Sequence, residues 1–413
     1  MSIKKEKIPI VRFRDFSEPW IKNQLSEVAE FSKGRGYSKK DLQSHGTPII
    51  LYGRLYTNYE SVISNVETYA NLEENSVVSE GGEVIIPASG ESADDISRAS
   101  CVIDRGIILG GDLNIVRPHE YLNSLFIAIT LSNGSQQREL SKRAQGKSVV
   151  HLHNSDLKSV KLFYPSYEEQ TAISSLFRTL DELLANYKDN LANYQSLKAT
   201  MLAKMFPKVG QTFPEIRLDG FEGEWEINKL NKYLTVSKKK NTQQKFGKED
   251  VLSVSGEVGI VNQIQFQGRS FAGVSVEMYS IVDTGNIVYT KSPLKANPYG
   301  IIKTNYGFPG IVSTLYAVYL PNENVFPGFV ERYFENDLRL NSYLKPLVNK
   351  GAKNDMKVSD ENALLGNVIF PKLEEQVAIS DYFTNLDKFI QSHKDKISQL
   401  ETLKKKLLQD MFI

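Results

Sequence analysis

Few residues in this 413-residue sequence are spaced in a way that could support catalysis. The tripeptide Asn297-Pro298-Tyr299 resembles the NPPY motif with which adenine methyltransferases hold a flipped base, but it lacks the second proline. The tripeptide Gly146-Lys147-Ser148 looks like the end of a phosphate-binding loop, yet Ser141 stands where that motif requires its first glycine. We therefore expect neither methyl transfer nor nucleotide binding by this chain, and no cofactor in it.

Metal-binding residue types are equally sparse. The histidines form no i, i+4 pair on a helix, and only His151 and His153, in a strand-like run, would share a face. Two imidazoles alone are a weak signal for a metal site, so surface or structural roles are favoured and no metal is expected. Cys101 has no second cysteine with which to form an intrachain disulfide, and we expect it to be a small buried hydrophobic residue.

Basic clusters are more informative than these motifs. Ser32-Lys33-Gly34-Arg35 falls opposite Ser237-Lys238-Lys239-Lys240 at an offset of 205 residues. Cations neutralise phosphates, while aromatic and polar side chains contact base edges. The alternative is that each cluster is a solvated surface loop, but the recurrence of a basic cluster in both halves favours DNA binding. We predict DNA contacts for Lys33, Arg35, Tyr37, Lys39, Tyr52, Arg54, Tyr56 and Ser89 in the first half, and for Lys238, Lys239, Lys240, Lys291 and Ser292 in the second.

The composition is that of a folded globular protein, with 41% hydrophobic and 24% charged residues. The net charge is only +1, so any DNA-binding surface must be a local cluster balanced by acidic residues elsewhere. The length favours two or more domains. No run of eighteen apolar residues and no signal peptide occur, so we expect a cytoplasmic protein without a membrane span.

An internal repeat organises the chain. Residues 163–206 align without a gap on residues 369–412, with 17 identities in 44 positions that include an EEQ tripeptide in each copy. A second match joins residues 11–20 with 216–225 and makes the only two tryptophans equivalent. Between these anchors the halves have diverged, although each keeps an extended run led by glycine, GEVIIPASG and GNIVYTKSP. Common helices beside unlike globular segments indicate a shared task for the helices.

Each EEQ segment has the features of a helix start, with a proline followed by acidic residues in the first turn. The apolar residues Ile173, Phe177, Leu180, Leu184, Tyr187, Leu191, Tyr194, Met201 and Met205 then recur at spacings of four and three, interrupted by Lys198. The second copy has the same seam, with His393 and Lys404 as its polar exceptions. This pattern predicts two helices of about 40 residues that pair as a coiled coil. Symmetry between the repeats favours an antiparallel pair.

The predicted fold class is α+β with a pseudo-two-fold internal repeat. Two globular mixed α/β segments, residues 1–162 and 207–368, alternate with two spacer helices, residues 163–206 and 369–413. Runs such as TPIILYG, GEVIIPAS, CVIDRGIILGG and GIVSTLYAVYLP predict strands, and EYLNSLFIAITLSN predicts a helix. The order of the strands is not predictable from these patterns.

The arrangement resembles the specificity subunit of type I restriction-modification enzymes. The resemblance covers essentially the whole chain and rests on P-x-x-EEQ at Pro165–Gln170 and Pro371–Gln376, and on the PEIRLDGFEGEW sequence at Pro214–Trp225. Glycine-led stretches ahead of each helix, Gly146–Leu157 and Gly351–Val358, are similar to the family pattern.

The resemblance implies a non-catalytic subunit whose two target-recognition domains each contact one half of a split DNA target, with the helices setting the gap. It also implies partners: two methyltransferase subunits that methylate adenine N6 from S-adenosylmethionine, and restriction subunits that use ATP and Mg. For docking on the helices we predict Glu168, Glu169, Gln170, Glu374, Glu375 and Gln376. The alternatives are a stand-alone enzyme and a coiled-coil adaptor that binds only protein.

Overall fold

The computed structural model describes residues 9–146, 149–294, 296–348 and 358–412. The chain divides into two compact units. Unit 1 comprises the residues up to Asp189 together with the segment from Asp395 to the C-terminus, and unit 2 comprises Asn190–Lys394. Each unit therefore contains one globular segment and parts of two long helices, α7 (Tyr167–Lys204) and α11 (Leu373–Asp410).

The globular part of unit 1 is built on a five-stranded sheet in the order β2-β10-β6-β8-β4, antiparallel except for β4 and β8. A smaller three-stranded sheet has the order β5-β3-β9. The elements are β1 (Ile21–Gln24), α1 (Leu25–Val28), β2 (Ala29–Lys33), β3 (Thr47–Ile50), α2 (Arg54–Thr57), β4 (Val62–Ile63), β5 (Tyr69–Ala70), β6 (Glu83–Pro87), β7 (Ser89–Gly90), α3 (Ala93–Ile96), β8 (Ser100–Val102), β9 (Ile108–Leu109), β10 (Leu113–Pro118), α4 (Ser124–Leu131), α5 (Gly134–Arg143), β11 (Val150–His151), α6 (Asn154–Lys158) and β12 (Lys161–Tyr164).

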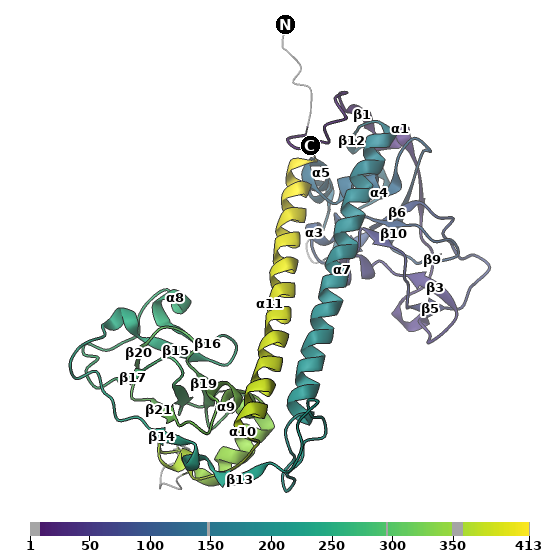
Figure 1. Cartoon of the computed structure of the whole chain (residues 1–413). Coiled ribbons are helices and arrows are strands. Elements are labelled where there is room, and N and C mark those ends of the chain that lie inside the picture. The colour runs from purple at the N-terminus through teal and green to yellow at the C-terminus, as the bar shows by residue number, and fades with distance from the viewer. Residues whose placement is uncertain (1–8, 147–148, 295, 349–357, 413) are drawn as a thin grey trace. The chain divides into compact units, whose positions relative to one another are not determined.

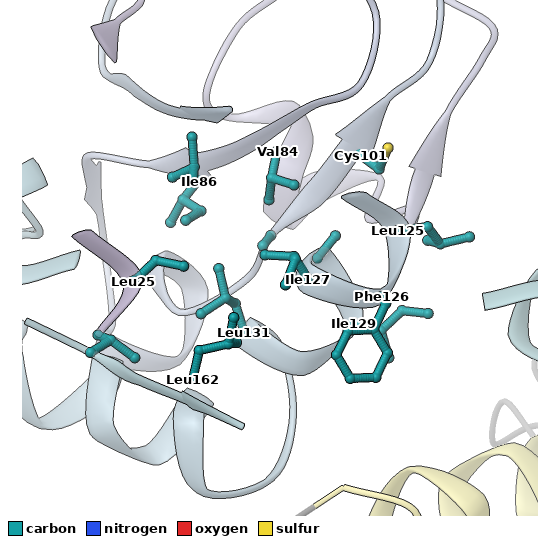
Figure 2. Packing of buried hydrophobic residues seen from close by; sticks show 14 of the residues in the cluster. Leu25, Val84, Ile86, Cys101, Leu125, Phe126, Ile127, Ile129, Leu131 and Leu162 are labelled. Carbon is teal, nitrogen blue, oxygen red and sulfur yellow. The ribbon is translucent and has the colours of Figure 1, made fainter. Parts of the chain in front are cut away.

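Helix α4 is the centre of the core of unit 1 (Figure 2). Its residues are apolar on every side and almost all buried, as expected for a helix enclosed by a sheet and by other helices. The Asn123 side chain caps its first turn by accepting a hydrogen bond from the Phe126 amide at 3.0 Å. Phe126 and Ile127 lie in one cluster with Val84 and Ile86 of the central strand β6.

Unit 2 has a four-stranded antiparallel sheet in the order β14-β21-β18-β19 and three two-stranded sheets, β13-β22, β15-β16 and β17-β20. Its elements are β13 (Glu226–Lys229), β14 (Leu234–Val236), β15 (Leu252–Ser255), β16 (Gly259–Asn262), α8 (Gln263–Gln267), β17 (Ser280–Val282), β18 (Ile287–Thr290), β19 (Ile301–Thr304), β20 (Gly310–Val312), β21 (Tyr316–Pro321), α9 (Pro327–Phe334), α10 (Asp337–Leu344) and β22 (Asn367–Phe370). The predicted strand runs and the predicted helix at α4 are confirmed.

The two units share one sheet plan with the same register. Val84 pairs with Val116 in unit 1, and Ile287 pairs with Tyr319, each 203 positions later, in unit 2. The glycine-led runs predicted as a common feature are β6 and β18, and both begin after a glycine in the left-handed region, Gly82 with φ 90° and Gly285 with φ 84°. The order and pairing of the four strands common to both sheets have therefore been preserved although the sequences have diverged.

The seam predicted for the two long helices is confirmed, since its positions are buried or half-buried along both α7 and α11. Within each unit the helices pair antiparallel, because contacts at higher residue numbers on one involve lower numbers on the other (Figure 1). In unit 1 Asp181 and Lys188 meet Lys404 and Glu401 respectively.

The two lysines that interrupt the seam are explained by reciprocal ion pairs. Lys404 pairs with Asp181 in unit 1, and its counterpart Lys198 pairs with Asp387 at 2.6 Å in unit 2. Ser61 donates to Asp181 at 2.7 Å, whereas Asp387 also binds Arg332 at 2.7 Å. Each lysine is thus neutralised inside the seam by an aspartate that the repeat places on the other helix.

The unit 2 ion pair belongs to a larger network. Glu335 binds Lys198 at 2.5 Å and Arg332 at 2.8 Å. Burial alone would raise the pKa of Glu335, but Arg332 and Lys198 together hold that pKa below its usual value. The carboxylate therefore stays charged where four side chains meet.

The end of each long helix completes the core of the unit that contains the start of the other helix. The ring centroid of Phe412, which follows α11, lies 5.9 Å from that of Phe126 and 5.7 Å from that of Phe177 in unit 1. Its counterpart Phe206, which follows α7, lies 5.8 Å from Phe329 and 6.1 Å from Phe383 in unit 2. Within the described residues, no helix is long and apolar enough to cross a membrane.

We expect Phe412→Ala to destabilise unit 1 and Phe206→Ala to destabilise unit 2, each by about 3–5 kcal/mol, because each change leaves a cavity among aromatic rings. Hydrogen exchange followed by mass spectrometry should show faster exchange in α4 for the first variant and in α9 for the second. Leu403→Ala, at an exposed position of α11, is the control and should change neither. Faster exchange in α9 alone after the Phe412 change would contradict this reciprocity.

Candidate nucleic-acid interface and the EEQ motif

The second glutamate of each EEQ motif forms a buried ion pair with an arginine from the segment ahead of its own globular part. Arg12 donates to both carboxylate oxygens of Glu169 at 2.7 Å, and Arg217 donates to those of Glu375 at 2.8 and 2.7 Å. The glutamate side chains are 1% and 3% exposed. The hydrogen bonds to Glu169 raise the pKa of Arg12, as a bidentate pair should.

The glutamine of each motif fixes the start of a core helix. Gln170 accepts a hydrogen bond from the Asn123 amide at 2.9 Å, and Gln376 accepts one from the Phe326 amide at 2.9 Å. Both amides stand at the N-cap positions of α4 and α9. Both glutamines also donate at 2.9 Å to the carbonyl of the proline that opens their own motif. The motif therefore joins the long helix to the core helix.

These contacts occupy part of the predicted docking set. Glu169, Gln170, Glu375 and Gln376 are buried in hydrogen bonds within their own units and present no surface to another protein. Only the first glutamate of each motif is exposed, so docking through EEQ stays a prediction for Glu168 and Glu374 alone. We call the Arg12–Glu169 and Arg217–Glu375 ion pairs the clamps. The equivalent tryptophans pack beside them, with ring centroids 5.8 Å apart for Trp20 and Phe126 and 6.0 Å apart for Trp225 and Phe329.

The two basic segments occupy equivalent places in the two sheets. Ala29 of β2 and Leu234 of β14 pair with Pro118 and Pro321, so the offset of 205 found between the basic segments holds for the strands before them. Lys33, Arg35 and Lys39 are exposed in unit 1, as are Lys238 and Lys239 in unit 2. Lys240 is half-buried and donates to Ser280 at 2.9 Å, while Lys239 pairs with Asp283 at 3.1 Å.

A close backbone approach positions the basic segment of unit 1. A Cβ atom on Gly34 would lie only 1.9 Å from the Gly110 carbonyl oxygen, so only glycine fits there. Gly110 in turn donates to Ile50 at the end of β3, the strand that leads to Tyr52. The structure thus brings the Lys33–Lys39 segment and the Tyr52–Tyr56 segment to neighbouring strands, β9 and β3.

Several side chains of unit 1 that were predicted to contact DNA are bonded or enclosed within the unit. The Tyr37 hydroxyl bonds to Asn71 and Ser76 at 2.8 and 2.6 Å. Arg54 pairs with Glu60 at 2.6 Å, and Ser89 is buried in β7. These three predictions are therefore not supported, since the polar atoms already have partners or are enclosed.

The remaining predicted residues are less accessible than expected. Tyr52 and Tyr56 are half-buried with ring centroids 6.1 Å apart, and burial raises the pKa of Tyr56. In unit 2 Lys291 pairs with Asp360 at 2.9 Å, and Ser292 is half-buried. The Lys291 ammonium therefore has an internal counterion, which does not support its predicted phosphate contact.

The motifs that suggested catalysis are structural where they are described. Asn297 is buried and donates to Asp337 at 2.8 Å, and the Tyr299 carbonyl accepts from Tyr289 at 2.5 Å. The phosphate-loop candidate contains Lys147 and Ser148, which lie outside the described residues, as does most of the glycine-led stretch ahead of α11. Neither can be compared with the prediction.

Histidine and cysteine positions agree with their predicted roles. The rings of His151 and His153 are exposed and parallel, with an interplanar angle of 1°, which confirms that they share a face. Among the described residues no cluster of three or more His, Cys, Asp or Glu side chains could hold a metal ion. Cys101 is buried as predicted (Figure 2), and desolvation together with Glu83 raises the pKa of its thiol to about 12.

Sequence reasoning missed one exposed segment of unit 2, residues 263–278, which contains α8 and the loop after it. It carries exposed glutamines, an arginine and large apolar side chains. Its apolar residues follow no helical or strand period, so periodicity could not identify it. The available signal was composition, since QIQFQGRSF mixes amides, a cation and aromatic rings within nine residues.

Three comparisons place this architecture among known proteins. The family described as type I restriction modification DNA specificity domain matches residues 17–194. The chain is 19% identical over 408 residues to the type I restriction enzyme MjaVIII specificity subunit of Methanocaldococcus jannaschii, which covers 95% of this chain and 91% of that protein.

One solved structure shares the fold of this chain. The crystal structure of the type I restriction-modification system S subunit from M. genitalium superposes with a TM-score of 0.58 at 14% identity, covering 98% of this chain and 99% of that chain. The HsdS subunit from Thermoanaerobacter tengcongensis has a TM-score of 0.45 at 15% identity, covering 94% and 95% of the two chains.

Replacing the buried glutamates should uncouple the clamp. We expect Glu169→Gln to lower the free energy of unfolding of unit 1 by about 3 kcal/mol, because Arg12 loses its counterion, and Glu375→Gln to act likewise on unit 2. Urea denaturation followed by tryptophan fluorescence measures this, since each unit holds one tryptophan. The exposed neighbours provide the controls: Glu168→Gln and Glu374→Gln should stay within about 0.5 kcal/mol. Equal effects in both sets would refute the clamp.

Proposed function

Because the chain belongs to the family of type I restriction-modification DNA specificity subunits, we propose that its two units each contact one half of a bipartite DNA target. The specificity subunit is itself non-catalytic and binds no cofactor, so methyl transfer and cleavage fall to partner subunits. The observation that carries the proposal is the common sheet plan with equivalent basic segments, from which unlike loops extend in the two units.

The unlike loops are suited to different half-sites. In unit 1 the strands of the sheet β5-β3-β9 come from the part of the sequence between the Lys33–Lys39 segment and β10. The corresponding part of unit 2 instead forms the hairpin β15-β16 with α8, and the pair β17-β20. Phosphate contacts from equivalent lysines would set a similar register on both half-sites. Side chains from the differing loops would then contact different base edges.

The long helices supply the second part of the proposal, the docking of partners. Each begins with an exposed glutamate, Glu168 or Glu374, beside a buried clamp that holds the helix start rigidly in its unit. Two equivalent helix starts suit two methyltransferase subunits that carry S-adenosylmethionine. Restriction subunits with ATP and Mg would complete the assembly. An adaptor that binds only protein is the competing function, and the lysines discriminate it.

The proposal is tested with the full chain and its methyltransferase partner. Sequencing of N6-methyladenine in a host that carries both identifies the target, and a duplex with that target is then compared with a scrambled duplex in binding. We expect preference for the target, and uniformly weaker DNA binding by Lys238→Ala/Lys239→Ala/Lys240→Ala with a salt dependence lowered by about one for each lost phosphate contact. Lys229→Ala/Lys232→Ala, on exposed lysines near β13, is the matched control. Equal binding of both duplexes by the unmodified chain sinks the proposal.

The gap between half-sites should depend on the length of the helices. Removing residues 186–192 from α7 and 393–399 from α11 takes one heptad from each and keeps the paired seam in phase. This shortens the helix pair by roughly 10 Å. We expect the preferred gap to shorten by about three base pairs at 3.4 Å each while both half-site sequences stay the same. Altered half-site letters in the methylation pattern would contradict a spacer role.

A further inference from the structure

Unit 2 exposes an unusual amount of apolar surface in one segment. Between β14 and β18 six large hydrophobic side chains are exposed, all within residues 258–278: Val258, Ile264, Phe266, Phe271, Val274 and Met278. The corresponding stretch of unit 1, between β2 and β6, exposes only Leu72 among its large hydrophobic residues. Contiguous exposed apolar side chains mark interaction surfaces, because leaving them in water is unfavourable. The surface belongs to unit 2 and is not a feature of the shared sheet plan.

Hydrogen bonds tie this segment to the basic segment of the same unit. The Asn241 amide donates to the Tyr279 carbonyl at 3.0 Å, and Gln244 donates to Glu277 at 2.5 Å. Lys240 reaches Ser280 directly after it. The exposed Lys238 therefore stands beside the exposed apolar segment and can bind phosphate there, whereas the adjacent Lys239 pairs with Asp283 at 3.1 Å.

The segment also carries exposed side chains of the types that contact base edges in protein–DNA complexes. Gln265, Gln267 and Arg269 are exposed on α8 and directly after it. The Arg269 guanidinium lies over the Phe271 ring with 4.6 Å between its central carbon and the ring centroid. This stacking holds a cation and an aromatic ring together as one projecting element.

These features match the side chains with which proteins enter the minor groove. Arginine and glutamine contact minor-groove edges, and an apolar side chain such as Phe or Met wedges between base pairs and unstacks them. A protein partner would account for the apolar side chains. It would not account for Arg269 or for the lysines of the neighbouring basic segment. The segment itself carries one cation, Arg269, and one anion, Glu277, so the preference for DNA rests on the types of its exposed side chains and on the neighbouring Lys238.

We propose that residues 263–278 form the minor-groove wedge of unit 2, with Phe271 and Phe266 unstacking a base step of the second half-site and Arg269 beside them in the groove. The proposal rests on the function proposed above and assigns it a mechanism. The described residues of unit 1 contain no such element, so the two half-sites are contacted differently: one by surface contacts alone, the other with local distortion. Base steps that unstack easily are favoured in the second half-site.

The test uses the full chain with its methyltransferase partner and duplexes that carry the mapped target. 2-Aminopurine, which brightens when unstacked, is placed at each position of both half-sites except the methylated adenines. We expect a fluorescence rise at one step of the half-site bound by unit 2 and none in the other. Phe266→Ala/Phe271→Ala should abolish that rise and weaken target binding roughly tenfold, the scale of one lost aromatic–base contact. Leu338→Ala, at an 81% exposed residue of α10, is the control.

The outcomes separate the wedge from the proposed function. A Phe266/Phe271 variant that keeps the fluorescence rise and the affinity overturns the wedge, even where the target is still preferred over scrambled DNA. A variant that binds DNA normally but no longer co-purifies with the methyltransferase makes the surface a protein interface, which also overturns it. No preference for the target by the unmodified chain removes the proposed function itself. Circular dichroism and an unchanged thermal midpoint verify that each variant is folded.

Discussion

Two buried carboxylates, Glu169 and Glu375, impose the constraint on which each unit depends. A buried glutamate is costly unless a cation reaches it with good geometry. The cation comes from residues 11–20 or 216–225, so the docked position of these segments helps to fix the start of the long helix. The neighbouring glutamine then joins the helix to the N-cap of α4 or α9, which packs within the core beneath the sheet. One tripeptide thereby sets the helix, the core helix and the sheet relative to one another within each unit.

This arrangement explains which parts of the repeat resemble each other in sequence. The clamp, the tryptophan beside it and the terminal phenylalanine interact through specific geometry, so their identities recur. The strands need only apolar side chains facing the core and ordinary backbone pairing, which many sequences satisfy. Their register is therefore the same in both units although few residues are shared. The loops beyond the strands meet neither requirement, and there the units differ in element type.

Sequence reasoning succeeded where one physical rule acts along a short stretch of chain. The heptad seam was predictable because burial repeats every three or four residues, and Lys198 and Lys404 stood out as interruptions. The ion pairing of Arg54 and Lys291 was not predictable, since each pair depends on a carboxylate that folding brings close. Glu169 was misjudged for the same reason: its partner lies 157 residues away. Residues 263–278 escaped notice because exposed apolar side chains have no period.

The position of Phe412 bears on how the chain folds during synthesis. Domains usually fold as they leave the ribosome, N-terminal segments first. Unit 1 departs from that order, because its core includes Met411 and Phe412 at the far end of the chain. Its first 189 residues must therefore wait, with part of their apolar surface uncovered, until residues 411 and 412 have been synthesised. Unit 2 needs only residues that precede Asp395, so all of its residues are made before residues 411 and 412. The globular segment made first is thus the last to close.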